Sequence, residues 1–186
     1  QLSSVVYWYQ AEPHAALPAL PPADQRAPAP EVMFWPDQEK LPAIEELRSR
    51  GVQLLMLCGR PEREMILAQP GFAAEAKSGH AYDGWNLPIH HCRTDNKELR
   101  IELTVPKGAR GTVRVYVIDP DVFEGGRREE VFVAGKSLGV VENFRDGRWL
   151  EHAIGPAESA EGKILIQARN LRQGSNAVIS IIEWVE

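Results

Sequence analysis

The chain of 186 residues has few of the side chains that build zinc sites and disulfide frameworks. Its two cysteines, Cys58 and Cys92, form no CxxC pair. His90 and His91 are adjacent, so on a strand they would point to opposite faces and would not chelate one ion. A structural zinc site is therefore not expected. The two cysteines permit one disulfide, but buried free thiols are equally compatible with the sequence, so the redox compartment stays open.

The chain also lacks an excess of basic residues and any long apolar run. Its formal net charge is −5, which argues against nucleic acid as a partner because phosphate binding requires a basic face. No apolar run approaches the ~20 residues needed to cross a bilayer, so no membrane span is expected. The sequence shows no glycine-rich phosphate loop, so no nucleotide cofactor is expected. It also shows no Ser-His-Asp elbow of the hydrolase type.

The first residues do not resemble a signal peptide, because they carry neither a Met, nor a charged region, nor an apolar core of the usual kind. They already have the composition of a strand. We therefore expect that polypeptide upstream of this chain is missing, together with any localisation signal. The compartment stays open, with a secreted or periplasmic location favoured.

The second half of the chain has the pattern of short strands separated by turns. Alternating or β-branched runs predict strands over residues 99–105, 112–118, 130–134, 149–154, 163–168 and 177–185. Glycine-containing turns separate them. This spacing favours a mainly β fold, a jelly-roll-like antiparallel β-sandwich with one or two short helices. The mixed charges of Arg127, Arg128, Glu129 and Glu130 are interpreted as solvated surface.

The middle of the chain predicts a short helix over residues 42–50, ended by Gly51, and then an apolar strand over 52–58. A further helical turn is predicted over residues 61–69. Residues 13–36 are rich in proline, which removes hydrogen-bond donors and fixes φ, so this stretch is expected to be an extended linker. The resulting division is a terminal strand and linker of a preceding jelly-roll domain (1–36) and an appended β-sandwich (37–186).

Residues 3–10 predict a strand on which Trp8, Gln10 and Glu12, just beyond it, share one face. Residues 3–14 read Ser-Ser-Val-Val-Tyr-Trp-Tyr-Gln-Ala-Glu-Pro-His and precede a proline-rich stretch. This segment resembles the DUF2961 family, now grouped as glycoside hydrolase family 172. The stretches 123–126 and 175–180 are similar, more loosely, to galactose-binding-type sandwiches that are often attached to such enzymes.

The resemblance implies a retaining hydrolase of fructofuranosides or arabinofuranosides that often assembles as a homo-trimer. It also implies that Glu12 is the catalytic nucleophile. Retaining glycosidases need a second carboxyl group about 5–5.5 Å away. In the family this acid lies on a preceding segment that the chain does not contain. We therefore expect the chain to be inactive alone and to require an upstream catalytic polypeptide as its partner.

The remaining candidates concern sugar binding. Trp8 is either a platform for a sugar ring or a core residue, and Gln10 is a donor to sugar hydroxyls. His14 is expected to orient Glu12 or contact substrate, or to be a plain surface residue. Trp85 sits in a turn where an exposed aromatic side chain would meet a sugar. The alternative to an enzyme fragment is therefore a non-catalytic carbohydrate-binding module, or a sandwich that makes only oligomer contacts.

Other residues are interpreted as structural. Asp119, Asp121 and Glu124 surround a turn, and the interpretation that they cap it is favoured over bound calcium, which needs more oxygen ligands. Trp149 is expected to pack in the core or at its rim. Trp184 is expected to lie in the core because it alternates with Ile182. No metal or other cofactor is assigned.

Overall fold

The computed structural model describes residues 48–58, 67–82 and 92–186. The strands are β1 (Val52–Leu57), β2 (Leu67–Ala68), β3 (Ala73–Ala76), β4 (His80–Tyr82), β5 (Cys92–Asp95), β6 (Glu98–Thr104), β7 (Gly111–Val117), β8 (Arg128–Val133), β9 (Lys136–Glu142), β10 (Arg148–Ile154), β11 (Lys163–Asn170), β12 (Ala177–Ile179) and β13 (Ile181–Val185). A short 3₁₀ helix, η2 (Phe123–Gly125), lies between β7 and β8. The predicted mainly β fold is confirmed. No helix in these ranges is long and apolar enough to span a membrane.

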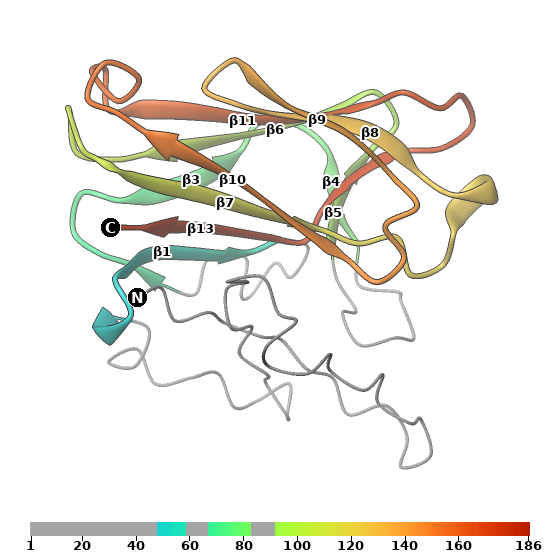
Figure 1. Ribbon diagram of the computed structural model, residues 1–186, viewed down its shortest axis with the longest axis horizontal. Helices are drawn as coiled ribbons and strands as arrows, with labels where there is room; N and C mark the ends of the chain where they lie inside the picture. Colours follow the sequence, from blue (N-terminus) through green and yellow to red (C-terminus); the bar gives the residue numbers. More distant parts are fainter. Residues whose placement is uncertain (1–47, 59–66, 83–91) are drawn as a thin grey trace, which may run out of the picture.

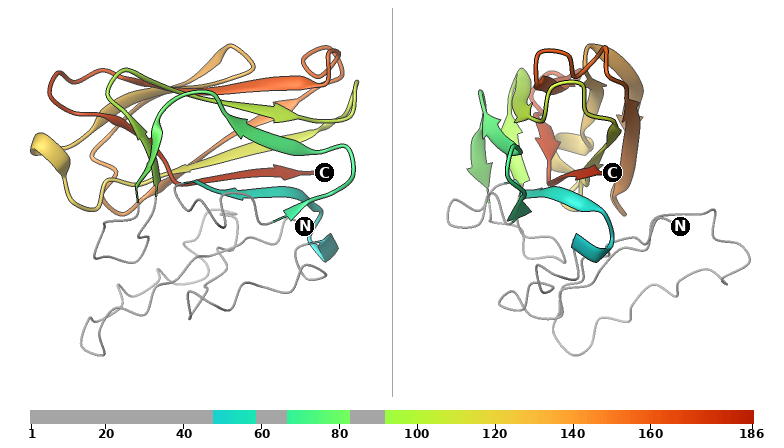
Figure 2. Two further views of the ribbon diagram at one scale, coloured as in Figure 1. Left: turned by 180° about the vertical axis from the view of Figure 1, so that it is seen from behind. Right: turned by 90° about the vertical axis from the view of Figure 1, so that its left-hand side faces the viewer.

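The strands form two facing sheets and a smaller third one (Figures 1 and 2). Sheet A has the order β10-β7-β13-β1-β2, and sheet B has the order β3-β6-β11-β8-β9. Sheet C, with the order β12-β5-β4, has three strands. Neighbouring strands pair antiparallel throughout the registers of the three sheets. The predicted antiparallel β-sandwich is therefore the observed architecture.

The core fills the space between sheets A and B. In β6 and β7 every second side chain is apolar and fully buried, as strand periodicity requires. These inward residues are Leu99, Ile101, Leu103, Val113, Val115 and Val117. Trp184 from β13 is also completely buried among them, which confirms its predicted core position. Trp149 is partly buried and its ring centroid lies 5.0 Å from that of Tyr116, so its predicted packing role is confirmed.

Strand β1 is an integral part of sheet A, because it lies between β13 and β2. Strand β3 likewise completes the edge of sheet B by pairing with β6. A fragment that began near Gly79 would lack both strands. Binding experiments on this fold therefore need β1 and β3 as well. The predicted domain boundary at residue 36 lies outside the described residues.

Three local predictions differ from the structure. Residues 177–185 form two strands, since the chain passes from sheet C to sheet A at Ser180. The backbone of Ser180 bonds to Cys58 and Tyr116 instead of continuing the ladder of β12. Leu67 and Ala68 belong to the short strand β2, so the helical turn predicted there is wrong for these two residues. Strands β3, β4, β5 and β9 were not predicted.

The helix predicted over residues 42–50 is described only at its end. Residues 48 and 49 are helical, and the N–H of Gly51 donates to the carbonyl of Arg48 at 2.9 Å. Gly51 has a φ of 77°, a left-handed conformation that glycine adopts readily. The predicted stop at Gly51 is confirmed, and residues 42–47 lie outside the described ranges.

Gly111 shows how tightly the core is packed, and it gives a first prediction. A Cβ atom at this position would lie 2.6 Å from the ring carbons of Trp184. Gly111→Ala is therefore expected to lower the free energy of unfolding by about 1–3 kcal/mol, the usual cost of overpacking. Urea denaturation measures this change.

Gly155→Ala is the matched control, because its added Cβ would meet nothing nearer than Glu158 Oε2 at 3.9 Å. Gly155 also has no positive φ. Its replacement is expected to stabilise the chain by about 0.4–1 kcal/mol, because alanine restricts the unfolded state. Equal effects of the two substitutions would contradict the packing described for Trp184.

Candidate functional site

The residues that the sequence singled out for catalysis or sugar binding lie outside the described ranges. They are Trp8, Gln10, Glu12, His14 and Trp85. Their assignments therefore stay predictions. A different candidate site is formed by described residues at one end of the sandwich, where the loops before β6, β8 and β12 meet.

The loop between β7 and β8 has a strained backbone. Val122 has a φ of 49° and Glu124 a φ of 49°, both in the left-handed region. This region is uncommon for non-glycine residues and a clear outlier for a β-branched one, at a cost of roughly 1–3 kcal/mol each. Phe123 lies between these two residues, and its side chain is partly exposed. Strain of this kind persists only where the surrounding structure holds the loop. Here the side chains of Asp119, Arg127 and Arg172 do so.

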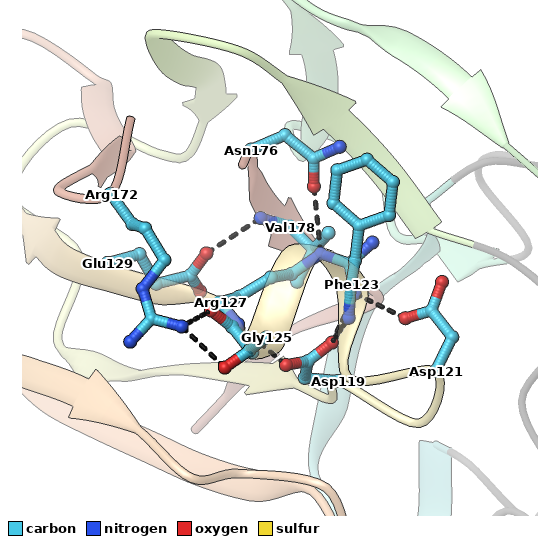
Figure 3. A network of polar contacts seen from close by, with 10 residues as sticks. Asp119, Asp121, Phe123, Gly125, Arg127, Glu129, Arg172, Asn176 and Val178 are labelled. Atoms are coloured by element: carbon cyan, nitrogen blue, oxygen red, sulfur yellow. Dashed lines mark hydrogen bonds and ion pairs between the residues drawn. The ribbon is translucent and has the colours of Figure 1, made fainter. Parts of the chain in front are cut away.

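Asp119 and Arg127 fasten the two ends of the loop (Figure 3). One carboxylate oxygen of Asp119 accepts from the Phe123 N–H at 3.3 Å, and the other accepts from the Arg127 N–H at 2.7 Å. The Arg127 guanidinium forms ion pairs with Asp119 and Asp121. Its Nε donates to Asn176 at 2.8 Å, and its Cζ lies 5.0 Å from the centroid of the Phe123 ring. Arg127 therefore supports one side of that ring.

The interpretation of residues 127–130 as solvated surface is wrong for two of them. Arg127 is only 4% exposed and Glu129 is fully buried. Because side chains alternate along a strand, Arg128 points outward, where it pairs with Glu142 at 3.2 Å. Glu130 also lies on the outer side and accepts from Ser137. A charge run over a strand thus divides between the interior and the surface.

The loop between β11 and β12 forms the opposite wall. The amide nitrogen of Asn170 donates to the backbone carbonyls of Asn96, Arg172 and Ser175. The Asn170 amide thereby closes this loop. Arg172 then reaches across and donates to the carbonyls of Gly125 and Gly126. One arginine therefore ties the two loops together.

These loops enclose a pocket of about 450 Å³. The described residues that line it are Asn96, Phe123, Asn170, Gln173, Gly174 and Ser175. The volume falls within the roughly 300–1,000 Å³ of small-molecule sites. Amide, hydroxyl and backbone groups accompany one aromatic ring, and no side chain in this described lining is charged. The pocket therefore suits an uncharged ligand with many polar groups.

Ser175 is the buried polar group of the pocket wall. Its side chain is 3% exposed, and within the described part of the chain its hydroxyl has no hydrogen-bond partner. An unsatisfied buried hydroxyl costs about 1–3 kcal/mol. The oxygen atom itself has almost no accessible surface, so Ser175 shapes the wall and does not present its hydroxyl to the pocket. Gln173 and Asn96, in contrast, are exposed at the rim.

Glu129 lies behind the arginine network and has no exposed surface. Its Oε2 accepts from the Val178 N–H at 2.7 Å (Figure 3). Burial raises the pKa of this carboxyl to about 8, and the nearby Asp119 carboxylate acts in the same direction. The Val178 N–H and Arg127 oppose the shift. Because the group is enclosed, it has no path to a ligand in the pocket.

The raised pKa of Glu129 predicts a pH dependence of stability. Between its ordinary pKa of 4.5 and about 8, the folded chain holds a proton that the unfolded chain has lost. The unfolding free energy therefore decreases as pH rises through this window. Glu129→Gln keeps an acceptor for Val178 without the charge, so we expect a smaller decrease in this variant.

Denaturant unfolding at pH 5 and pH 9 measures this difference. Glu130→Gln removes one carboxylate from the outer side of the same strand and serves as the control, with the native pH dependence expected. A Glu129→Gln profile parallel to that of the native chain would show that this carboxyl does not cause the decrease.

The other residues noted in the sequence have structural surroundings. Asp119 and Asp121 face Arg127, and in the described ranges no three His, Cys, Asp or Glu side chains converge to hold a metal ion. Cys58 and Cys92 are both buried and not joined in a disulfide. Desolvation raises the pKa of the Cys92 thiol, which makes it a poor nucleophile.

Sequence reasoning did not single out Phe123 or Ser175 as site residues. They are far apart in the chain, and only the packing of the two loops brings them to one pocket. The sequence does contain one signal near Phe123, the glycine pair Gly125-Gly126. In the structure both glycines have a positive φ, of 83° and 100°. Such a pair indicates a tight turn beside Phe123.

Comparisons with known proteins give distant matches only. No family profile matches the chain, and no curated protein does. Solved structures with a similar arrangement include a family 35 carbohydrate binding module from an environmental isolate, at 14% identity and a TM-score of 0.35. The match covers 50% of this chain and 69% of that module.

Two larger proteins are matched over part of their length. The ectodomain of ANX2 from Arabidopsis thaliana has 9% identity and a TM-score of 0.44, over 73% of this chain and 50% of that one. A β-glucuronidase from Bacteroides uniformis has 10% identity and a TM-score of 0.46, over 72% of this chain and 18% of the enzyme. At such scores the likeness carries no conclusion about ligand or activity.

Proposed function

We propose that the sandwich is a non-catalytic carbohydrate-binding module that holds its ligand in the loop-end pocket. The observation that carries the proposal is the lining, in which the partly exposed ring of Phe123 stands beside uncharged amide and hydroxyl groups. A sugar ring presents C–H groups that pack on an aromatic face and hydroxyl groups that hydrogen-bond to amides. The fixed loops reduce the entropy lost on binding.

The described charged groups beside the pocket support binding more than hydrolysis. A glycosidase needs two carboxyl groups that reach the scissile bond. Asp119 and Asp121 instead face Arg127, and Glu129 is enclosed. Isothermal titration of the full chain with a panel of neutral methyl glycosides tests the proposal. Saturable binding to a member of the panel is expected, and no heat from any of them would contradict it.

A second proposal follows from the resemblance of residues 3–14 to glycoside hydrolase family 172. Under this proposal, the chain is the C-terminal part of a retaining furanosidase and works with an upstream polypeptide. Glu12 is the nucleophile, and the enzyme assembles as a homo-oligomer. The binding module would then keep the enzyme near its substrate. Glu12→Gln in the full-length protein is expected to abolish turnover of furanosides, and unchanged turnover would remove Glu12 from this role.

A further inference from the structure

The outer face of sheet A, on the side away from sheet B, is buried. Leu54 and Met56 of β1 point into the core, and because side chains alternate along a strand, Leu55 points to the opposite side. Leu55 nevertheless has no exposed surface. Five buried apolar side chains of the described chain stand apart from the main core in this way: Val52, Leu55, Leu57, Ile181 and Val185. An uncovered sheet face is normally solvated and polar, so this one is suited to a covering layer.

The same face holds a buried ion pair. Glu183 of β13 lies opposite both Leu55 of β1 and Arg114 of β7, so the three side chains share one face. Arg114 Nη1 donates to Glu183 Oε2 at 2.7 Å, and the two side chains are 5% and 0% exposed. Within the described ranges the other oxygen, Glu183 Oε1, is buried without a hydrogen-bond partner. A buried carboxylate oxygen normally has a donor, so the covering layer is expected to supply one.

The chain enters β1 beside this face. Arg48 and Ser49 are helical and exposed, whereas Arg50 is partly buried and its Nη1 atom is fully buried. Burial raises the pKa of Glu183 to about 7, and the positive charges of Arg114 and Arg50 oppose this shift, so Arg50 lies close enough to act on the carboxyl. The last helical residues therefore face outward, while Arg50 is directed toward the sheet.

The sequence upstream of β1 offers a matching surface. Residues 42–50 predict a helix, and at about 3.6 residues per turn its apolar side chains fall on the same side as Arg50. These side chains are Ala43, Ile44 and Leu47. Ser49 falls on the opposite side. A helix this close in the chain to β1 reaches the sheet through a short connection, at little cost in loop-closure entropy.

We propose that residues 42–50 form a helix that packs its apolar side on the outer face of sheet A and brings Arg50 to Glu183. The start of β1 lies beside the end of β13 and the start of β7, whereas the loop that carries Phe123 follows the other end of β7 (Figure 1). The chain thus enters the sandwich at the end opposite the pocket. A helix docked on sheet A leaves the pocket open to a ligand.

The first test places a charge on the proposed contact in the chain of 186 residues. Leu47→Asp is expected to lower the urea midpoint by about 1 M, because a carboxylate would be buried against apolar side chains. Ser49→Asp introduces the same residue on the exposed side of the helix and is expected to keep a midpoint close to the native one. A native midpoint for Leu47→Asp would overturn the docked helix.

The second test locates the contact by double-mutant cycles. If Leu47 packs on Leu55, the midpoint shift of Leu47→Ala with Leu55→Ala is smaller than the sum of the two single shifts. Leu54→Ala is the matched control, because Leu54 is equally buried but points into the core, so its shift is expected to add to that of Leu47→Ala. Where a double variant does not fold, Leu55→Val and Leu54→Val take the place of the alanine variants. Additive shifts in both pairs would overturn the contact.

Sedimentation velocity decides whether a second copy of the chain covers this face instead. An oligomeric state that Leu55→Ala leaves unchanged agrees with a helix from the same chain. A native dimer that Leu55→Ala dissociates and Leu47→Asp does not would overturn the proposal, because the second copy would then be the covering layer.

Discussion

Phe123→Ala is expected to weaken binding of a neutral saccharide by about 10-fold or more, with little loss of stability. The ring is the aromatic surface among the described lining residues, and its removal leaves the sugar without an apolar face to pack on. The side chain is partly exposed, so its truncation opens no large cavity in the core. Isothermal titration with the neutral methyl glycoside that the native chain binds measures the effect.

Phe132→Ala provides a closely matched control. Phe132 lies on β8 in sheet B, is also partly buried, and has the Arg169 guanidinium at 5.0 Å from its ring centroid. It thus shares with Phe123 the residue type and the stacked arginine but does not belong to the described lining. Its replacement is expected to leave affinity unchanged. If both variants lose affinity equally, the aromatic contact with sugar does not lie in this pocket.

Arg127→Met is expected to have the largest effect on stability, a decrease of about 3–5 kcal/mol in the free energy of unfolding. Asp119 is only 3% exposed, so the substitution leaves a carboxylate with little solvent and without its cation. Asp121 also loses its ion pair with Arg127. The strained loop at Val122 and Glu124 loses one of its supports as well. Urea denaturation at pH 7 gives the change.

Arg128→Met is the control for this prediction, since the neighbouring arginine is exposed and pairs with the exposed Glu142. Exposed ion pairs contribute about 0–1 kcal/mol. A small change for Arg128→Met beside a large one for Arg127→Met is therefore expected. Similar changes in the two variants would mean that the buried network does not stabilise the fold.

The sequence predicted the parts of the fold whose pattern reflects burial on one face of a strand. Strict alternation placed β6 and β7 within one residue of their observed ends. Strand β9 was not predicted because its burial does not alternate. Gly139, with a φ of 102°, also interrupts the strand pattern. Its pairing with β8 also contains a register shift next to Val131. A bulged edge strand has no clean period for sequence analysis to detect.

The mostly apolar stretch 177–185 was taken for one strand for a similar reason. Every described residue of β12 and β13 is buried, so composition alone gives no sign of the crossing at Ser180. The hydrogen bonds of Ser180 to two other segments mark the change of sheet. Only the tertiary arrangement contains that information.

The candidate site was less predictable than the fold. Arg127 and Glu129 read as surface residues because charged side chains are seldom buried without partners. The partner of Glu129, Val178, comes from a distant segment, and Asp119 reaches Arg127 only because the loop between them folds back. The residues that the sequence did favour, such as Glu12 and Trp85, lie outside the described ranges. Residue types in a short segment can suggest candidate site residues. A pocket lined by three separate loops can be recognised only in the folded chain.

The most direct test of the account is amide chemical-shift mapping of the full chain during titration with a neutral methyl glycoside. The account predicts saturable shifts that cluster at Asn96, at Phe123 and over residues 170–175. Shifts concentrated on the outer face of either large sheet, or no saturable shifts with any glycoside of the panel, would contradict a saccharide site at the loop end of this sandwich.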